Sequence, residues 1–262
     1  MASDLINTLY AIEDLFSSSI SLKQQEFECS IAYIGGIDEA KFNVLLQRQH
    51  LSQPELLISS VKEYFKKNTI SSWVYVVPST FDTPLLQCAL KDHGFVFDEN
   101  STAMYYPLGT PIKNIAEPEN PLIIQYADTN KSGWFKILQD AFGGTDLTNA
   151  QYAQALDRAK EKEVDMQHFL GTLDGEPIAA ITLTFSSDSI RIDNVATIPT
   201  HQHVGYGSQM VQFGINLAHI KGFKYCFLDA SSNGLSIYQR LGFCEIFTYH
   251  IYMCEGEGLT TT

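Results

Sequence analysis

The chain has 262 residues, 45% of them hydrophobic and 12% aromatic, which is enough for one or two packed domains and argues against disorder. Its 17 basic and 30 acidic residues give a net charge of −13, so the surface is a poor partner for nucleic acid or an anionic membrane and tolerates a cationic substrate, with solubility as the alternative reason for most of the charge. The five cysteines form no C-x-x-C pair, His201 and His203 have no nearby Cys or acidic partner, and no signal peptide or membrane span is recognisable, so we expect a cytoplasmic protein without a metal site.

The first segment, residues 1–108, mixes helical and strand-like patterns. Apolar residues three and four apart predict helices, and β-branched and aromatic runs predict strands. Pro54 suits the first turn of a helix, and Gly94 suits the end of one. In chain order, we predict a helix over residues 5–16, a strand over 28–34, a helix over 54–67, a strand over 73–77, a helix over 85–92 and strands over 95–97 and 103–108.

A linker separates this segment from the rest of the chain. Residues 109–121 contain a glycine, three prolines and two asparagines with little apolar content, which is typical of a connection between domains. We therefore predict a first domain over residues 1–108, a linker over 109–120 and a second domain over 121–254, followed by a frayed tail over 255–262.

The second domain has a pattern that distinguishes it from the common nucleotide-binding folds. The predicted elements are a strand at 122–126, helices at 134–142 and 148–162, strands at 166–172, 177–185 and 190–196, a helix through 210–220, a strand at 225–229, a helix at 235–241 and a strand at 247–253. This order predicts an α/β fold with a mixed sheet, of the α+β kind. A Rossmann domain would place its glycine loop after the first strand, and a P-loop would end in Lys-Ser or Lys-Thr; neither condition is met.

A loop with glycines at positions 205 and 207 follows the fourth strand and precedes a helix. The first N–H groups of a helix lack internal partners and carry partial positive charge, and glycine lets a phosphate approach the backbone closely. The loop therefore fits an anion site. An ordinary tight turn between strand and helix is the alternative interpretation.

Two motifs in this domain resemble those of the GNAT (Gcn5-related) N-acetyltransferase superfamily. The loop Gln202-His-Val-Gly-Tyr-Gly207 is similar to the family's acyl-CoA loop, Arg/Gln-x-x-Gly-x-Gly/Ala, with Gln in place of the commoner Arg. The segment Ser232-Asn-Gly-Leu-Ser-Ile-Tyr-Gln-Arg-Leu-Gly-Phe243 is similar to the family's Asn…Tyr-x-x-x-Gly-Phe segment. The resemblance covers residues 121–254 and implies an acetyl-CoA-dependent N-acetyltransferase with the GNAT fold, acting on a primary amine of a small molecule or a protein.

The same resemblance assigns roles to individual residues. Tyr238 takes the place of the family's general acid, and a phenol with a pKa near 10 stays protonated until the thiolate leaves. Asp193 is the first candidate for the general base, with Asp229 second. The residues implied in acetyl-CoA binding are Val195, Ala196 and Thr197 along the splayed fourth strand, Gln202, His203, Val204, Gly205, Tyr206, Gly207 and Ser208 in the loop, and Asn233 beside the CoA arm.

Each assignment has a structural alternative. Tyr238 could pack as a core tyrosine beside Phe243, Asn233 could belong to a plain turn, and acidic residues at strand ends are usually solvated. For the whole domain, the alternative is a non-catalytic acyl-CoA-binding or protein-interaction module.

The first segment resembles a degenerate copy of the second. Aligning Gly94-Phe95 with Gly242-Phe243 gives an offset of 148 residues, which brings the helices and strands of the two segments into approximate register. At this offset Leu90 replaces Tyr238 and Leu85 replaces Asn233, and no glycine lies just ahead of Pro54. We therefore predict a tandem GNAT arrangement with one CoA site per chain, in which the degenerate first domain shapes the acceptor cleft. An unrelated helical-β domain is the alternative.

Overall fold

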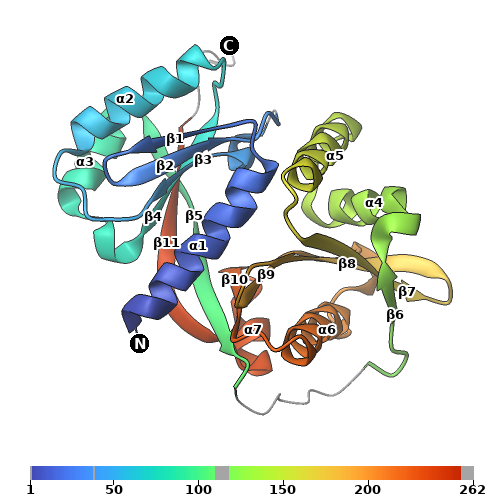
Figure 1. Ribbon diagram of the computed structural model, residues 1–262. Coiled ribbons are helices and arrows are strands. Elements are labelled where there is room, and N and C mark those ends of the chain that lie inside the picture. Colours follow the sequence, from blue (N-terminus) through green and yellow to red (C-terminus); the bar gives the residue numbers. More distant parts are fainter. Residues whose placement is uncertain (1, 38, 110–117, 255–262) are drawn as a thin grey trace.

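The strands of both halves of the chain join in one mixed sheet. The computed structural model describes residues 2–37, 39–109 and 118–254, and the part described contains an eleven-stranded sheet in the order β1-β2-β3-β4-β11-β5-β10-β9-β8-β7-β6 (Figure 1). The first half contributes α1 (Ala2–Ile20), β1 (Lys23–Phe27), β2 (Ser30–Ile34), β3 (Asn43–Gln47), α2 (Pro54–Lys67), β4 (Trp73–Pro78), α3 (Pro84–Asp92) and β5 (Phe95–Pro107). The second half contributes β6 (Ile123–Tyr126), α4 (Lys131–Phe142), α5 (Asp146–Glu161), β7 (Met166–Leu173), β8 (Glu176–Phe185), β9 (Ser189–Thr197), α6 (Tyr206–Ile220), β10 (Tyr225–Ser231), α7 (Leu235–Leu241) and β11 (Cys244–Cys254).

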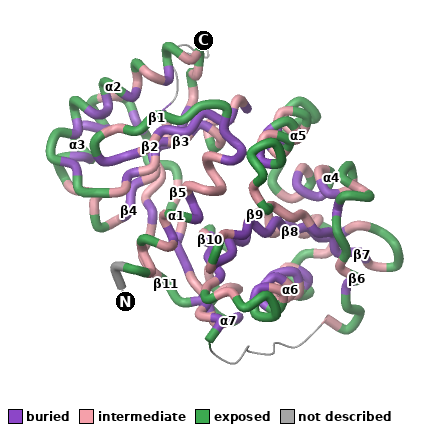
Figure 2. The backbone as a smooth tube through the Cα atoms, viewed as in Figure 1, coloured by how far each residue is buried: buried purple, intermediate pink, exposed green. Residues whose placement is uncertain are grey.

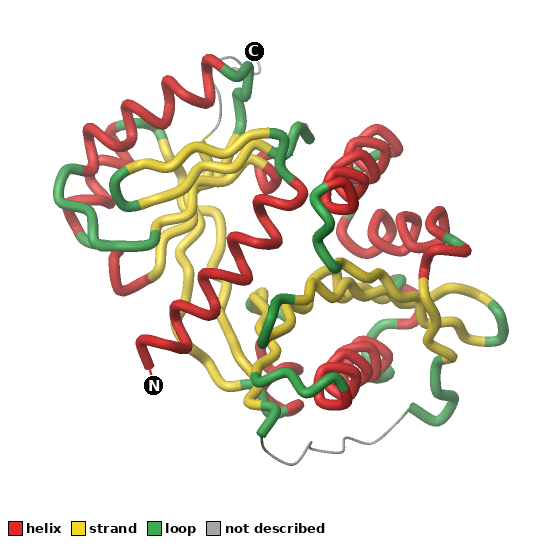
Figure 3. Tube along the Cα trace, in the orientation of Figure 1, coloured by secondary structure: helices red, strands yellow, loops and turns green. Residues whose placement is uncertain are grey.

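The second half has the element order that its sequence predicts, and the alternation of helices and strands is visible along the tube in Figure 3. Short 3-10 turns, including Pro199–His201, connect several of its elements. One helix differs in detail. Helix α6 begins at Tyr206, ahead of the predicted residues 210–220, and its buried residues are Tyr206, Met210, Val211, Gly214, Ile215 and Ala218, whereas Ile220 at its end is 80% exposed.

In the first half, strands β1 and β3 were not predicted, and the two strands predicted over residues 95–97 and 103–108 form the single strand β5. β1 is polar and lies at the edge of the sheet, so it lacks the apolar pattern of a buried strand. β5 is continuous from Phe95 to Pro107, although its middle reads as a polar loop, Asp98-Glu-Asn-Ser-Thr102. This segment is extended because β11 pairs with it on one side and β10 pairs with its later part on the other.

The two halves of the chain exchange their final strands. β11, the last strand of the second half, lies between β4 and β5 of the first, and β5 pairs with β10 of the second. The antiparallel β5–β11 ladder pairs Phe95 with Cys254 and Tyr105 with Cys244. The start of each strand therefore pairs with the end of the other. β3–β4 and β9–β10 are the corresponding parallel pairs, followed by α3 and α7. This repetition matches the predicted tandem GNAT arrangement.

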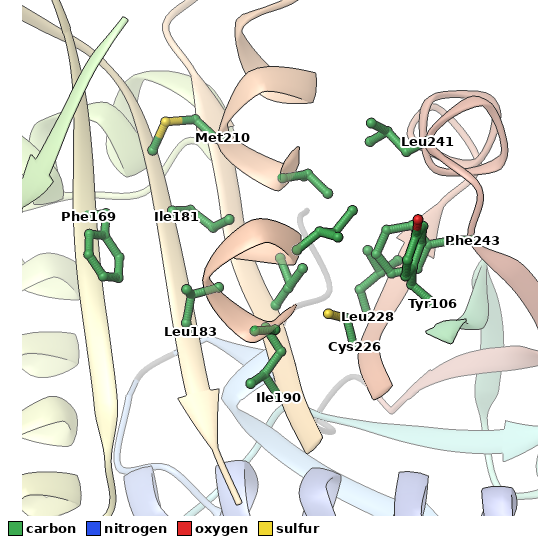
Figure 4. Close-up of a cluster of buried hydrophobic side chains, with 14 of the residues drawn as sticks. Tyr106, Phe169, Ile181, Leu183, Ile190, Met210, Cys226, Leu228, Leu241 and Phe243 are labelled. Atoms are coloured by element: carbon green, nitrogen blue, oxygen red, sulfur yellow. The ribbon is translucent and has the colours of Figure 1, made fainter. Parts of the chain in front are cut away.

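Helices cover both faces of the sheet in the second half, with α6 on one face and α4 and α5 on the other (Figure 1). The strands between them, β8 above all, are nearly continuously buried (Figure 2). The α6 face holds a core that includes Phe169, Ile181, Leu183, Met210 and Leu228 (Figure 4). On the opposite face, α1 of the first half packs against α5 and β9, with Phe16 and Ile20 joining the core beneath α4 and α5. The first half therefore closes one face of the second.

The predicted linker and tail fall largely outside the described residues. Residues 110–117 and 255–262 are not among those described, so the structure neither confirms nor contradicts those two predictions.

Candidate active site

Strands β9 and β10 run side by side at their start and then separate. They pair in parallel at Ser189, Ile190 and Arg191, and no further pair joins these two strands in the described part of the chain. Beyond Arg191, β9 continues on β8 alone and β10 continues on β5 as far as Ser231. The facing edges of the two strands are therefore free to pair with an extended ligand. We call this separation the β9–β10 opening.

A bulge in β9 lies at the opening. Asn194 has a φ of 53°, and the pairing with β8 skips from Asp193 opposite Thr182 to Ala196 opposite Ala180. The Asn194 side chain stabilises the bulge, because its Nδ2 donates to Thr182 Oγ1 at 3.0 Å and to the Tyr152 hydroxyl at 2.9 Å. Bulges commonly redirect a strand next to an active site. The bulge changes the direction of β9 at the point where Val195, Ala196 and Thr197 begin.

The glycine loop lies directly after β9. Gly205 caps α6 with a φ of 100°, a left-handed conformation that other residues adopt only with strain. The first intrahelical bond runs from Gln209 N to Gly205 O at 3.0 Å, so the N–H groups of residues 206–208 precede any helical acceptor. Gln202 donates from Nε2 to the Thr197 carbonyl at 3.0 Å, which ties the loop to the end of β9.

The loop leaves space above the helix terminus. A Cβ atom added to Gly207 would meet only Thr197 Oγ1, at an ordinary contact distance of 3.7 Å. His203 has a φ of 64° and Val204 is 56% exposed, so the loop turns its apolar side chain outward. The predicted anion-binding residues thus form one continuous turn at the N-terminus of α6, beside the opening.

Tyr238 lies half-buried on α7, on the other side of the opening. Its ring meets Phe243 edge to face, with centroids 5.9 Å apart. A Cβ on Gly234 would lie 3.0 Å from Tyr238 Cε2, so a larger residue there would press on the ring. Burial and the nearby Asp193 carboxylate raise the pKa of Tyr238 to about 12. Asn233 is exposed in the turn ahead of α7.

Asp193 and Asp229 flank a buried arginine. Arg191 donates from Nε to Asp193 Oδ1 at 3.0 Å and from Nη2 to Asp229 Oδ2 at 2.6 Å. Burial raises the pKa of Asp193 to about 6, against the opposing effect of Arg191, and the negative charge of Asp229 raises it further. Asp193 Oδ2 and Asp229 Oδ1 are both buried without a hydrogen-bond partner among the described residues.

Sequence reasoning missed Arg191 and the groups behind it. Alternation along β9 places Arg191 and Asp193 on the same face of the sheet, and a single cation between Ile190 and Ile192 was the signal that could have revealed it. Glu13 of α1, which completes this cluster from the first half, carries no local signal in the sequence.

Other features of the described residues lie apart from the opening. A cavity of about 740 Å³ lies between α4, α5 and the start of β7, and none of the predicted site residues lines it. Among the described residues, no group of His, Cys, Asp or Glu side chains is arranged to hold a metal ion. No helix in the described ranges is long and apolar enough to cross a membrane.

Comparisons with known proteins bear on the fold and on the family. The model of the acetyltransferase (GNAT) family matches residues 132–243. A GCN5-related N-acetyltransferase from Kribbella flavida superposes with a TM-score of 0.70 at 15% identity, over 98% of this chain and 96% of that one. A GCN5-related N-acetyltransferase from Sphaerobacter thermophilus gives 0.66 at 14% identity, over 89% and 80% of the two chains.

A tandem GNAT protein from the clavulanic acid biosynthesis pathway gives a TM-score of 0.59 at 11% identity, over 88% of this chain and 80% of that one. These structures share the fold over most of the chain, beyond the residues that the family model matches. The chain therefore has a tandem GNAT fold, and its residues 132–243 match the model of the GNAT acetyltransferase family.

Proposed function

We propose that the protein is an acetyl-CoA-dependent N-acetyltransferase that moves an acetyl group directly to a primary amine. The family and fold support acyl-CoA-dependent N-acetyl transfer in general. The observation that carries the finer proposal is the β9–β10 opening, which has the glycine loop at one end and both Asp193 and Tyr238 beside it.

Acetyl-CoA supplies the activated acetyl thioester. Its pyrophosphate would be held by backbone N–H groups of the loop, from His203 to Ser208, with Gln202 and Asn233 nearby. Two observations support the fit: the left-handed φ of Gly205 and the free space above Gly207. The pantetheine arm would pair with the free edge of β9 at Val195, Ala196 and Thr197. An N–H of that edge would stabilise negative charge on the thioester oxygen as it develops.

Asp193 would act as the base, and Tyr238 as the acid. Asp193 takes a proton from the acceptor ammonium, the neutral nitrogen bonds to the acetyl carbon, and the carbon–sulfur bond breaks. Tyr238 donates its proton to the departing sulfur, the Tyr238 phenolate recovers a proton from the newly bonded nitrogen, and Asp193 releases its proton to solvent. A phenol with a pKa near 12 is a weak acid, but one cause of that value is the Asp193 charge, which disappears when Asp193 takes its proton. The base therefore strengthens the acid as the reaction proceeds.

The acceptor in this proposal is a cationic amine, on a small molecule or on a protein lysine or N-terminus. The net charge of −13 and the two unpartnered carboxylate oxygens beside the opening favour a positively charged substrate over an anionic one.

The first half would carry no second CoA site. Its helix α2 begins after Gln53 with Pro54, and no glycine lies just ahead of it to admit a phosphate. Leu90, at the position aligned with Tyr238, is buried in the core of that half, and Leu85 replaces Asn233. We propose that this half is a degenerate copy that supports the acceptor side of the active half.

Two measurements test the proposal together. Calorimetry with acetyl-CoA reports binding, and release of free CoA thiol in the presence of a panel of amines, including polyamines and lysine peptides, reports transfer. Binding with thiol release that depends on the amine supports the proposal. Binding without release on any amine favours the alternative, a non-catalytic acyl-CoA-binding module. Absence of binding at millimolar acetyl-CoA rejects both functions.

A further inference from the structure

The floor of the β9–β10 opening is a cluster of buried charges that both halves of the chain build. Arg191 is only 8% exposed, and its guanidinium bonds to Asp193 on its own strand and to Asp229 on β10. Its third nitrogen, Nη1, has no hydrogen-bond partner among the described residues. Glu13 Oε1 lies 3.8 Å from Nη1.

Glu13 comes from α1 of the first half, which packs across β9 and α5. The residue is 5% exposed, and two donors bind its carboxylate. Arg48 Nη1 donates to Glu13 Oε2 at 2.7 Å, and the Tyr249 hydroxyl donates to Glu13 Oε1 at 2.8 Å. Phe16, one turn further along α1, places its ring under the Arg191 guanidinium at 5.5 Å. Helix α1 thus touches Arg191 through one charged and one aromatic side chain.

The cluster has more acidic than basic groups. Four carboxylates, Glu13, Asp14, Asp193 and Asp229, share the guanidinium groups of Arg48 and Arg191. Burial raises the pKa of Glu13, and the Asp229 charge adds to the effect. Because Arg191 is shared, any charge on Glu13 draws on the same guanidinium that stabilises the anionic forms of Asp193 and Asp229.

We propose that Glu13 is a positioning residue for the active half, which acts through Arg191 to set the orientation and the proton affinity of Asp193. The inference rests on the proposed function, in which Asp193 is the base, but it concerns a different residue and a different half of the chain. It gives the degenerate half a specific role: α1 supplies a charged group to a site that it does not otherwise form.

The groups that face Asp193 come from four elements, and a fifth acts through Arg191. Arg191 lies on β9, Asp229 on β10, Tyr152 on α5 and Tyr238 on α7, while Glu13 on α1 reaches Asp193 only by way of Arg191. Arg48 and Tyr249 in turn hold Glu13. Among these, Glu13 and Asp229 are the carboxylates that compete with Asp193 for positive charge.

The chain offers a matched pair of variants on adjacent residues of α1. Glu13→Gln removes the charge beside Arg191 and keeps acceptor oxygen for Arg48 and Tyr249. Asp14→Asn also removes a carboxylate bound to Arg48, at 2.6 Å, but no ion pair joins Asp14 to Arg191. Both variants are compared with wild type in the full-length protein, after thermal melting confirms that each is folded.

The first readout is the acid limb of the kcat/KM against pH profile. Removing the Glu13 charge leaves more of the Arg191 charge for Asp193, so the anionic form of Asp193 is favoured. The apparent pKa of the acid limb should fall by about half a pH unit or more in Glu13→Gln and stay unchanged in Asp14→Asn. A purely structural role for Glu13 would lower activity without moving this midpoint. An unshifted midpoint, or an equal shift in both variants, overturns the proposal.

The second readout does not need activity. In protein labelled at the aspartate carboxyl carbons, the Asp193 signal is assigned by its loss in Asp193→Asn and followed through a pH titration by NMR. If the titration midpoint of Asp193 falls in Glu13→Gln and not in Asp14→Asn, the proposal is supported, even when no amine is acetylated and the proposed function fails. Coincident titration curves for wild type and Glu13→Gln reject it, whatever the activity.

Discussion

Arg191 Nη2 donates a hydrogen bond of 2.6 Å to Asp229 Oδ2, joining β9 to β10 just beyond the last backbone pair of those strands. Where the sheet would otherwise continue by peptide hydrogen bonds, a side-chain ion pair spans the two strands. The two strands can therefore separate beyond this point while their first residues stay paired. The β9–β10 opening therefore begins at an ion pair between side chains, where backbone hydrogen bonds between the two strands end.

The buried Asp193 carboxyl should make stability depend on pH. Its pKa is raised in the folded protein, from 3.8 to about 6, so the folded state binds the proton more tightly than the unfolded state. Its contribution is therefore fully present below pH 4 and is lost as pH rises through about 6, which amounts to about 2–3 kcal/mol. Between pH 4 and pH 7.5, the free energy of unfolding of Asp193→Asn should therefore rise by that amount relative to that of the wild type.

Urea unfolding at the two pH values measures the difference. Comparing the variant with wild type at each pH cancels the contribution of the other titrating groups. A gap between the two proteins that stays constant with pH would show that Asp193 has an ordinary pKa.

Tyr238→Phe should lower kcat by about 10² to 10⁴-fold, because it removes only the proton-donating hydroxyl. The affinity for acetyl-CoA should change little, since the ring and its contact with Phe243 remain. Tyr106→Phe is the control: that ring also meets Phe243 edge to face, from β5. Steady-state kinetics and calorimetry give both quantities. A large loss of affinity in Tyr238→Phe would assign the tyrosine a structural role.

Glycine substitutions should distinguish two effects, a loss of stability from backbone strain and a loss of acetyl-CoA binding from a blocked site. Gly205→Ala places a side chain at a φ of 100° and Gly222→Ala places one at 79°, so each should lose about 1–2 kcal/mol of stability. Gly207 has no positive φ, and Gly207→Val should keep stability. Only the variants at positions 205 and 207 should lose acetyl-CoA binding, because Gly222 lies at the far end of α6.

Melting temperature and calorimetry are the two readouts for that set. Tight acetyl-CoA binding by Gly207→Val would show that the free space above the helix terminus does not hold the phosphates.

Exchange of β5 and β11 should make the two halves fold together. We propose that residues 1–108 and 121–254 are two GNAT-like domains, each completed by the other's last strand. The intact chain should therefore unfold in one cooperative transition in urea, with circular dichroism and tryptophan fluorescence coincident. Trp73 reports on the first half and Trp134 on the second. Two separated transitions, one for each tryptophan, would contradict this arrangement.

The sequence predicts well what local chemistry determines. The bounds of α2 and α7 agree with prediction, because Pro54 begins the first helix and Gly242, with a φ of 103°, ends the second. The glycine loop and its place after the fourth strand also follow from local residue types. For the same reason the tandem repeat could be detected from a few punctuating residues such as Gly94.

What escaped prediction depends on partners far along the chain. Asp98–Thr102 reads as a loop and is extended only because β11 lies beside it, more than a hundred residues later. Arg191 looks out of place in an apolar strand until Asp229 and Glu13 are brought against it. No pattern within either segment could reveal that α1 closes a face of the other half.

Calorimetric titration of the full-length protein with acetyl-CoA shows whether the β9–β10 opening binds this co-substrate. We expect saturable binding with one site per chain, abolished by Gly207→Val and retained by Tyr238→Phe. Two sites per chain would contradict the assignment of the first half as degenerate. Binding that is unaffected by Gly207→Val, or no binding at millimolar acetyl-CoA, would contradict the assignment of the β9–β10 opening as the acetyl-CoA site.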